Sequence, residues 1–217
     1  MATVARALPL LGLRITAGPV VLRGITDDLL GPLADLAIEG IHGPDAMPFS
    51  DPWTLTPPED MHRSFAQFYW RQRADFSPAK WSANFAVTWH GKLVGVQGIS
   101  TRDYLVTRTA DTGSWLGRRF HGRGVGTAMR KVICVFAFDH LVAEYVTSST
   151  FADNPASVAV SKKVGYTEKG WSRVNRLGKP VTMRELSLTA GKLVRYEHPL
   201  AIEGVAEFRQ SIGLDVD

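Results

Sequence analysis

Cysteine is almost absent from this chain, and so is any long apolar stretch. The single cysteine among 217 residues, Cys134, excludes an intrachain disulfide, and its place on the apolar side of an expected helix predicts a buried thiol. No stretch approaches the roughly 18 apolar residues that a membrane span requires. The apolar segment 1–11 contains Arg6 and Pro9 and lacks the pattern of a signal peptide. We therefore expect a cytoplasmic protein with no membrane partner.

Metal-ligand spacing is also missing, because the 6 histidines form no H-x-x-x-H pair and have no cysteine beside them. We expect no metal. The net charge of +4 is modest, and no aromatic-basic RNA motif or helix-turn-helix pattern accompanies it, so we expect no nucleic-acid partner. The cations that do gather lie around one glycine-rich run and suit a polyphosphate: Arg118, Arg119, Arg123, Arg130 and Lys131.

The apolar content of 45% suffices for one substantial core, and helical and strand periodicities alternate along the chain. We expect a loose first dozen residues, a proline-rich loop at 40–58 and a C-terminal tail at 189–217. The expected strands are 13–23, broken at Gly18-Pro19, then 85–89, 93–96, 112–117, 144–149 and 181–188. The expected helices are 27–38, 59–75, one beginning at 125, and 155–165.

The run Arg119-Phe120-His121-Gly122-Arg123-Gly124-Val125-Gly126 is the most informative segment. Glycine tolerates positive φ, so backbone N–H groups can converge on an anion where a helix begins. A P-loop would need Gly-Lys-Ser/Thr at its end, and here Thr127 and Ala128 follow Gly126. The G-x-G-x-x-G dinucleotide pattern is missed as well, because the spacing is G-x-G-x-G. The run therefore predicts a different pyrophosphate loop.

That loop, read as R-x-x-G-x-G at Arg119, Gly122 and Gly124, resembles the pyrophosphate loop of the GNAT family of CoA-dependent N-acyltransferases. A second segment follows in the right order, with Asn154 and Ser157 as N-x-x-S and Gly165-Tyr166 as its end. The chain is most similar to the RimJ/RimL-like branch, and segment 39–53 resembles mycobacterial members associated with succinyl-CoA. The resemblance covers roughly residues 13–188, with 189–217 as a tail packing on the domain or on a neighbouring subunit.

The resemblance implies an α/β GNAT fold: a mixed, mostly antiparallel central sheet, splayed between its fourth and fifth strands and flanked by helices. The pantetheine arm of CoA would lie in the gap and contact 115–117, using backbone groups as a missing strand would. The residues expected to bind CoA are Trp115, Leu116, Gly117, Arg119, His121, Gly122, Arg123, Gly124, Val125, Gly126, Thr127, Asn154, Ser157 and Lys162.

The family reaction is direct attack of a neutral amine on the thioester. Ser157 matches the serine to which protonation of the leaving thiolate is attributed, although a serine there can also satisfy a helix end. The tyrosine that many members carry seven residues after the asparagine is replaced by Ser161. For the base we favour Asp111 over Glu39, His42, His121 or a bound water. Asn154 serves equally well as a helix cap.

Glu39, His42 and Trp53 are expected to shape the acceptor or acyl pocket. Together these features predict an N-acyltransferase that uses acetyl-CoA or succinyl-CoA and acts on a primary amine of a small molecule or protein. The alternative is a catalytically silent CoA-binding sensor or scaffold. Apolar residues in the tail favour a homo-oligomer.

Overall fold

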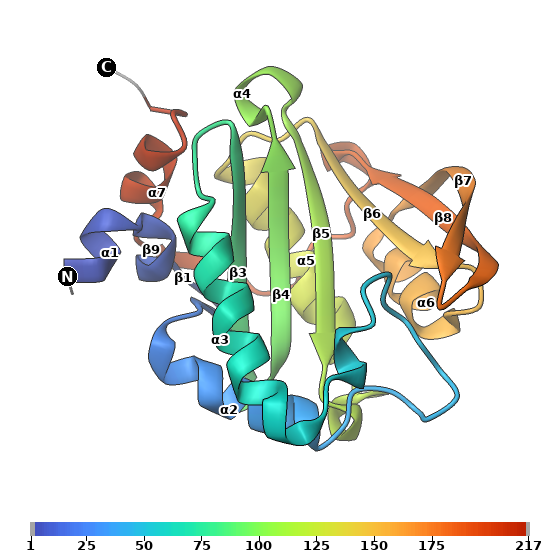
Figure 1. Cartoon of the computed structure of the whole chain (residues 1–217). Helices are drawn as coiled ribbons and strands as arrows, with labels where there is room; N and C mark the ends of the chain where they lie inside the picture. The colour runs from blue at the N-terminus through green and yellow to red at the C-terminus, as the bar shows by residue number, and fades with distance from the viewer. Residues whose placement is uncertain (1–2, 216–217) are drawn as a thin grey trace.

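The computed structural model describes residues 3–215, which fold around one nine-stranded sheet in the order β7-β8-β6-β5-β4-β3-β2-β1-β9 (Figure 1). The strands are β1 (Arg14–Ala17), β2 (Val20–Gly24), β3 (Lys80–Trp89), β4 (Lys92–Arg102), β5 (Thr109–Leu116), β6 (Tyr145–Phe151), β7 (Thr167–Arg176), β8 (Lys179–Leu188) and β9 (Ala201–Glu203). The helices are α1 (Thr3–Ala7), α2 (Asp27–Ile38), α3 (Pro58–Ala74), α4 (Tyr104–Thr107), α5 (Val125–Asp139), α6 (Pro155–Val164) and α7 (Val205–Ser211). Short 3-10 turns are η1 (Pro9–Gly12), η2 (Trp53–Leu55), η3 (Arg118–Phe120) and η4 (Ala190–Lys192).

Helices cover both faces of the sheet, with α2 and α3 on one side and α5 on the other (Figure 1). Helix α5 buries most of its residues, and Phe136 packs edge to face against Phe85 of β3 at 6.4 Å. On the opposite face, Met61 and Phe65 of α3 belong to a second buried cluster that includes Val96 of β4. The sheet is therefore the middle layer of three, as the alternation of strand and helix patterns predicted.

Every strand pair is antiparallel except β5 with β6, which confirms the expected mixed, mostly antiparallel sheet. The parallel ladder is short: it pairs 109–111 with 145–147 and stops at Asp111 and Thr147. Beyond that point the ladder ends and β5 and β6 diverge (Figure 1), and we call this break between the two strands the opening. The sequence predicted this divergence between the fourth and fifth strands, but it lies between the fifth and sixth. The count differs because the expected strand 13–23 is a hairpin of β1 and β2, with a turn at Gly18, whose φ is +53°.

The β3–β4 hairpin forms where the sequence predicted it. Its two turn residues, His90 and Gly91, have φ of 48° and 75°, the left-handed conformations that a tight hairpin turn requires. Strand β7, by contrast, was not expected, because none of its residues is fully buried and its sequence has no alternation of apolar and polar residues. Its turn with β8 uses Leu177 and Gly178, so β8 begins at Lys179 rather than at 181.

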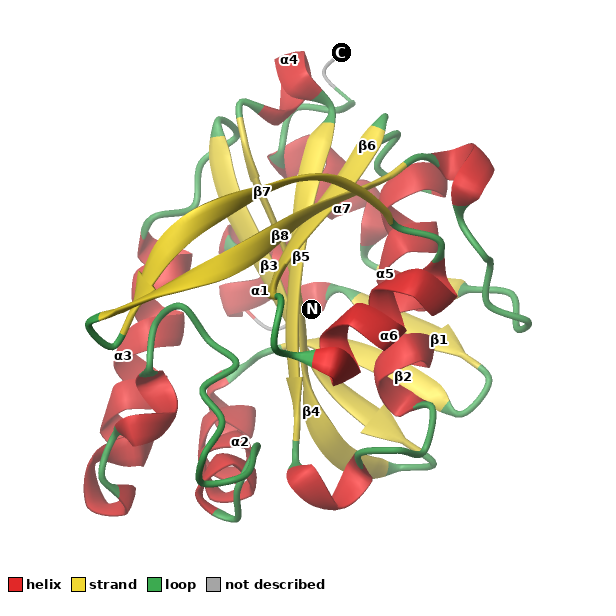
Figure 2. Ribbon diagram, turned by 90° about the vertical axis from the view of Figure 1, so that its right-hand side faces the viewer, coloured by secondary structure: helices red, strands yellow, loops and turns green. Residues whose placement is uncertain are grey.

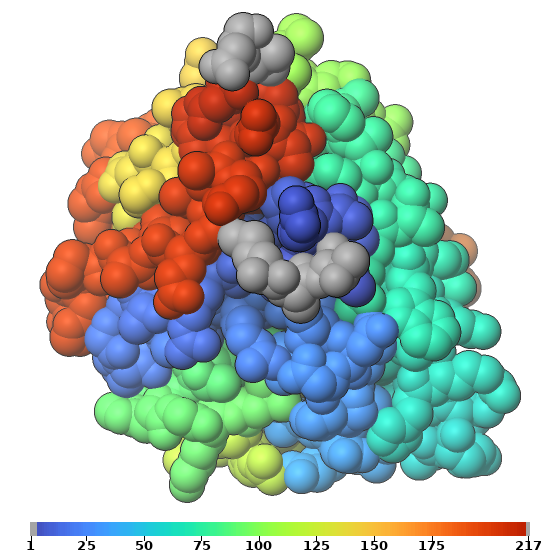
Figure 3. Space-filling model, turned by 90° about the vertical axis from the view of Figure 1, so that its left-hand side faces the viewer, coloured from blue at the N-terminus to red at the C-terminus, as the bar shows by residue number. Residues whose placement is uncertain are grey.

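Both chain ends are more ordered than expected. Residues 3–12 form α1 and η1 and bury Leu10 and Leu11, so the prediction of a loose start was wrong. In the tail, β9 pairs with β1, and Phe208 of α7 is fully buried against Trp81 at 5.3 Å. Figure 3 shows the C-terminal segment lying directly beside the N-terminal one. Among residues 3–215, no helix is long and apolar enough to span a membrane.

Candidate active site

The glycine-rich loop forms an anion cradle at the start of α5. Gly122 and Gly124 have φ of 74° and 83°, and Gly124 is the N-cap of the helix. Its carbonyl accepts the N–H groups of Thr127 and Ala128, whereas no hydrogen bond within the described part of the chain uses the N–H groups of 122–126. Successive free amides at a helix N-terminus suit a pyrophosphate, so the loop fits CoA as the sequence implied.

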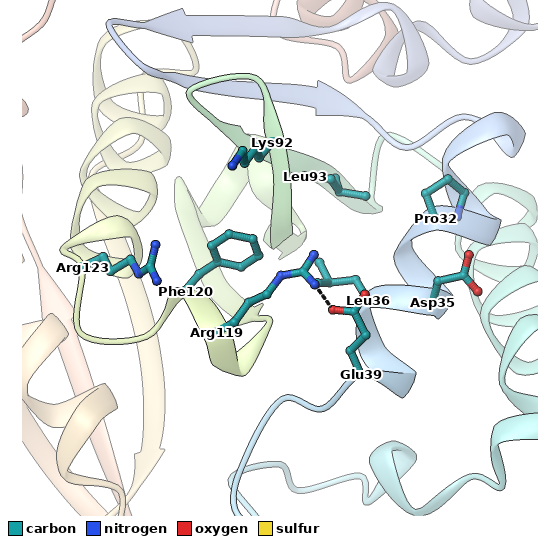
Figure 4. A pocket seen from close by; sticks show the side chains of 9 residues that line it. All are labelled: Pro32, Asp35, Leu36, Glu39, Lys92, Leu93, Arg119, Phe120 and Arg123. Carbon is teal, nitrogen blue, oxygen red and sulfur yellow. Dashed lines mark hydrogen bonds and ion pairs between the residues drawn. The ribbon is translucent and has the colours of Figure 1, made fainter.

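Arg119 does not point at this cradle. Its guanidinium pairs with Glu39 at the end of α2 (Figure 4). The same guanidinium lies 4.9 Å from the centroid of the Phe120 ring. The pair lines a cavity of about 600 Å³ between α2, the start of β4 and η3. Its remaining lining residues are Pro32, Asp35, Leu36, Lys92, Leu93 and Arg123. Glu39 is thus held at the loop entry, apart from His42 and Trp53.

Three other expected CoA contacts lie in different surroundings. His121 turns back and donates from Nε2 to the carbonyl of Leu116, the last residue of β5, at 3.1 Å. Thr127 is half-buried in the first turn of α5. Lys162 is exposed on α6. Of these three side chains, only His121 makes a hydrogen bond to β5 beside the opening.

The sequence left Asn154 and Ser157 each able to cap helix α6 or to contact a ligand, and the structure distinguishes the two residues. The Asn154 side-chain oxygen accepts the backbone N–H of Ser157 at 3.1 Å, so Asn154 is the cap. The Ser157 hydroxyl is half-buried and makes no hydrogen bond within residues 3–215. It shares a helix face with Val160 and Val164, and Val160 approaches Gly126 of α5. The hydroxyl is therefore available for a ligand.

Side-chain hydroxyls replace the backbone ladder where β5 and β6 part. Thr112 donates to the carbonyl of Thr147 at 3.1 Å, and Ser148 donates to the carbonyl of Thr112 at 3.0 Å. Thr112 also bonds the Tyr166 hydroxyl at 2.9 Å. Burial raises the pKa of the Tyr166 phenol and that of the neighbouring Cys134 thiol, the latter to about 11, so both stay neutral. The inner end of the opening is consequently a rigid polar floor.

Arg130 lies under this floor, although the sequence placed it among the surface cations of the phosphate loop. Its side chain is 5% exposed and reaches from α5 to both strands. It donates to Ser114 Oγ of β5 at 2.8 Å and to Ser148 Oγ of β6 at 3.0 Å. The earlier grouping was wrong because position 130 falls on the inward face of α5, beside the buried Met129 and Ile133.

Asp111 lies on the other face of the same opening, within β5 rather than at its entry. Its carboxylate accepts a hydrogen bond from Thr147 Oγ1 at 2.9 Å and is open to water. The surrounding protein atoms nonetheless desolvate the carboxyl and raise its pKa, while Thr147 and Arg130 act in the opposite direction. Gly113 and Trp115 share this face, and Gly113 opposes Gly98, so the surface between Asp111 and Trp115 carries no side chain.

The proline-rich loop covers the lower part of this face. Trp53 packs between Phe49 at 5.2 Å and Trp115 at 5.7 Å, and His42 bonds Thr54 at 2.8 Å. The loop is tied to the β7–β8 hairpin because Arg176, paired with Asp153, donates to the Met47 carbonyl at 3.2 Å. His42 and Trp53 are therefore brought together at the mouth of the opening.

Comparison with known proteins decides the family. Residues 20–167, more than half of the chain, match the family model described as Acetyltransferase (GNAT) domain. The chain belongs to the GNAT family. It is 29% identical over 103 residues to the protein named Putative ribosomal N-acetyltransferase YdaF of Bacillus subtilis (strain 168), which is 48% of this chain and 54% of that protein. The match thus spans about half the length of this curated relative.

Two solved structures show the same fold. Mycobacterium smegmatis RimJ, in complex with CoA-disulfide, superposes with a TM-score of 0.67 at 19% identity and covers 93% of each chain. RimL, a ribosomal L7/L12 alpha-N-protein acetyltransferase solved with coenzyme A, gives a TM-score of 0.63 at 14% identity, over 80% of this chain and 95% of that one.

Within this GNAT chain, the divergence of β5 from β6 is also visible from the side, where β7 and β8 form a curved arm in front of the sheet (Figure 2). Sequence reasoning missed Ser114, Arg130, Phe49 and Arg176 as parts of the site. The only available signal was for Arg130, a charged residue inside an otherwise apolar helical stripe. Within the described residues, no group of His, Cys, Asp and Glu could hold a metal ion.

Proposed function

We propose that the protein transfers an acetyl group from acetyl-CoA to a primary amine by direct attack on the thioester. The observation that carries this proposal is the set of free N–H groups at 122–126, which leads directly into the opening between β5 and β6. A pyrophosphate held at the loop would send the pantetheine arm along 114–116, where β5 has no partner strand on its β6 side.

The groups around the inner end of the opening divide the proton chemistry. Asp111 reaches it from the face of α3 and takes the proton that the attacking amine loses. Ser157 comes from α6 on the other side and donates a proton to the departing sulfur. The raised pKa of the exposed Asp111 carboxyl supports its assignment as base, because partial desolvation by the surrounding protein atoms makes the carboxylate a better proton acceptor.

The acceptor is an amine of a small molecule or of a protein terminus. Trp53 and Trp115 supply an apolar wall, and Asp111 supplies a negative charge that attracts an ammonium group before it loses its proton. RimL is named as an acetyltransferase of the ribosomal protein L7/L12, and YdaF is named as a putative ribosomal N-acetyltransferase. A ribosomal protein N-terminus is therefore the first protein acceptor to test.

Calorimetric titration with CoA, acetyl-CoA and succinyl-CoA tests the donor site. We expect all three to bind through the loop, with acetyl-CoA at least as tight as succinyl-CoA. Tighter binding of succinyl-CoA would redirect the proposal to succinyl transfer, and no binding of any of the three would refute it. Thiol release from the preferred donor, measured over a panel of amines and N-terminal peptides, then identifies the acceptor.

One observation favours a second candidate, a CoA-binding sensor without turnover. The position that carries a tyrosine in many family members is Ser161, which is 3% exposed and cannot reach a ligand in the opening. Tight acetyl-CoA binding without thiol release for any amine would establish the sensor. Thiol release that depends on Ser157 would exclude it.

A further inference from the structure

Arg130 presents an unusual balance of charge. Its guanidinium is buried, and within residues 3–215 no carboxylate forms an ion pair with it. Its Nε is buried as well and has no hydrogen-bond partner. Burying an unpaired cation costs stability, and replacing such a group by an apolar side chain of similar volume is often neutral or stabilising. Packing alone therefore does not account for an arginine at this position.

The partners of Arg130 show where its charge is directed. Both of its terminal nitrogens donate to hydroxyls that flank the opening, Ser148 on β6 and Ser114 on β5. Ser148 passes its own hydrogen to the carbonyl of Thr112 at 3.0 Å. The hydrogen of Ser114 is different: no acceptor takes it up among the described residues, and Ser114 is half-exposed. The chain of donors therefore ends at Ser114.

Ser114 lies at the depth that the reacting carbonyl would reach. The part of β5 from Leu116 to Thr112 pairs with β4 on one side but has no partner on its β6 side. It connects the phosphate cradle to the point where β5 joins β6. That length is about 14 Å at roughly 3.4 Å per residue, and Ser114 stands in its middle. Asp111 lies on the opposite face of the same strand, so an amine beside Asp111 would attack towards Ser114.

We propose that the Ser114 hydroxyl donates a hydrogen bond to the thioester oxygen in the transition state, and that Arg130 is the positioning residue that orients and polarises it. The inference rests on the proposed acyl transfer. As the amine nitrogen bonds to the carbonyl carbon, the C=O electron pair moves to oxygen. Collapse restores C=O, breaks the C–S bond and expels the thiolate. Asp111 takes the amine proton, and Ser157 protonates sulfur and regains its proton from solvent.

The physical effect of Arg130 is twofold. A hydroxyl that accepts a bond from a guanidinium becomes a stronger donor, because its oxygen is already polarised. The fixed positive charge of Arg130, which is itself buried, would also stabilise the oxygen on which negative charge develops. Both effects act mainly on the transition state, so they are expected in kcat rather than in donor affinity.

The test compares wild type with Ser114→Ala, Ser114→Thr, Arg130→Met and the double variant Ser114→Ala/Arg130→Met. We expect Ser114→Ala to lower kcat about 100-fold, as removal of one oxyanion donor does, with KM for acetyl-CoA and the thermal midpoint nearly unchanged. Ser114→Thr keeps a hydroxyl and should restore most of kcat. Arg130→Met should lower kcat without lowering the midpoint, and the double variant should stay within about threefold of Ser114→Ala, because Arg130 acts through Ser114.

Failure of the role of Ser114 and failure of the proposed acyl transfer give different results. If wild type binds no CoA or transfers to no amine, the proposed function fails. If wild type is active and both Ser114→Ala and Arg130→Met keep kcat within about twofold, only the present inference fails. The pH dependence of kcat should keep its shape in Ser114→Ala. A shifted profile would show that the variant acts through Asp111 and would also overturn the inference.

Discussion

The two faces of β5 carry opposite chemistry, although they belong to the same eight residues. On the α5 side, Thr112 and Ser114 are hydroxyls bonded to the buried cation of Arg130. On the α3 side, Asp111 is an exposed carboxylate whose pKa is raised by the surrounding protein atoms, and Gly113 and Trp115 follow it on the same face. Because strand side chains alternate, one segment supplies a positive donor side and a negative acceptor side.

The contrast exists only because the sheet opens between β5 and β6. In a continuous sheet, the backbone ladder would separate the two sets of side chains. Here the ladder stops at Asp111 and Thr147, so a thioester in the gap can be approached from both faces. The positive charge of Arg130 on one face lowers the pKa of the Asp111 carboxyl on the other, against the larger opposing effect of desolvation.

The largest effect is expected from removing the acceptor-side charge. Asp111→Asn should lower kcat by about 10²–10⁴, the range of a lost general base, with CoA affinity unchanged. Steady-state kinetics with the preferred amine measure it. The control is Glu185→Gln, another exposed carboxylate on the same sheet face, which lies opposite Ser149 of β6. Equal losses in both variants would assign the effect to surface charge and remove Asp111 from the mechanism.

The same substitution has a pH signature. Because partial desolvation by neighbouring protein atoms raises the pKa of the Asp111 carboxyl, the stability gained from its protonated form is present at low pH and is lost as pH rises through the folded-state value. Asp111→Asn should therefore raise the thermal midpoint slightly at neutral pH. In wild type, kcat should fall as pH drops through that same raised pKa. A profile governed by an ordinary aspartate pKa would contradict this environment.

A second test changes the backbone of the phosphate-binding loop. Gly124→Val places a β-branched residue at φ 83° and should weaken CoA binding about 100-fold or more, as expected from two lost charge-assisted bonds of about 1.5–3 kcal/mol each. The matched control is Gly126→Ala, whose Cβ would meet Leu116 at 3.5 Å and Val160 at 3.6 Å, ordinary contacts. Calorimetry should show a large loss for the first variant and a small one for the second.

The smallest effect on kcat is expected at α6, where it tests whether Ser157 and Asn154 have different roles. Ser157→Ala should lower kcat about tenfold or more while leaving the thermal midpoint unchanged, since its hydroxyl has no partner in the described structure. Asn154→Ala should instead cost about 1 kcal/mol of unfolding free energy, as loss of an N-cap does. A lower midpoint for Ser157→Ala with unchanged kcat would reverse the two roles.

Local signals predicted the parts that depend on neighbours in sequence. The glycines that need positive φ, the Asn154 cap with Pro155 after it, and the His90-Gly91 turn could all be read directly. Strand β7 could not, because its half-buried face carries mostly polar residues and so leaves no apolar alternation in the sequence. Arg130 was misplaced, and the pairing of Arg119 with Glu39 was not foreseen, for a related reason: a charged side chain shows no preference in sequence between water, a carboxylate and a set of buried hydroxyls.

The sequence by itself determined the phosphate cradle, since glycine conformation and free helix amides are properties of consecutive residues. It also determined the family, through the order of the two motifs. Tertiary packing alone turned Arg130 inward and left the Ser157 hydroxyl without a hydrogen-bond partner among residues 3–215. It also brought the end of the β5–β6 ladder beside Asp111 and Ser114, which lie on opposite faces of β5. Those facts depend on where β5 and β6 part, a long-range packing outcome that no local pattern encodes.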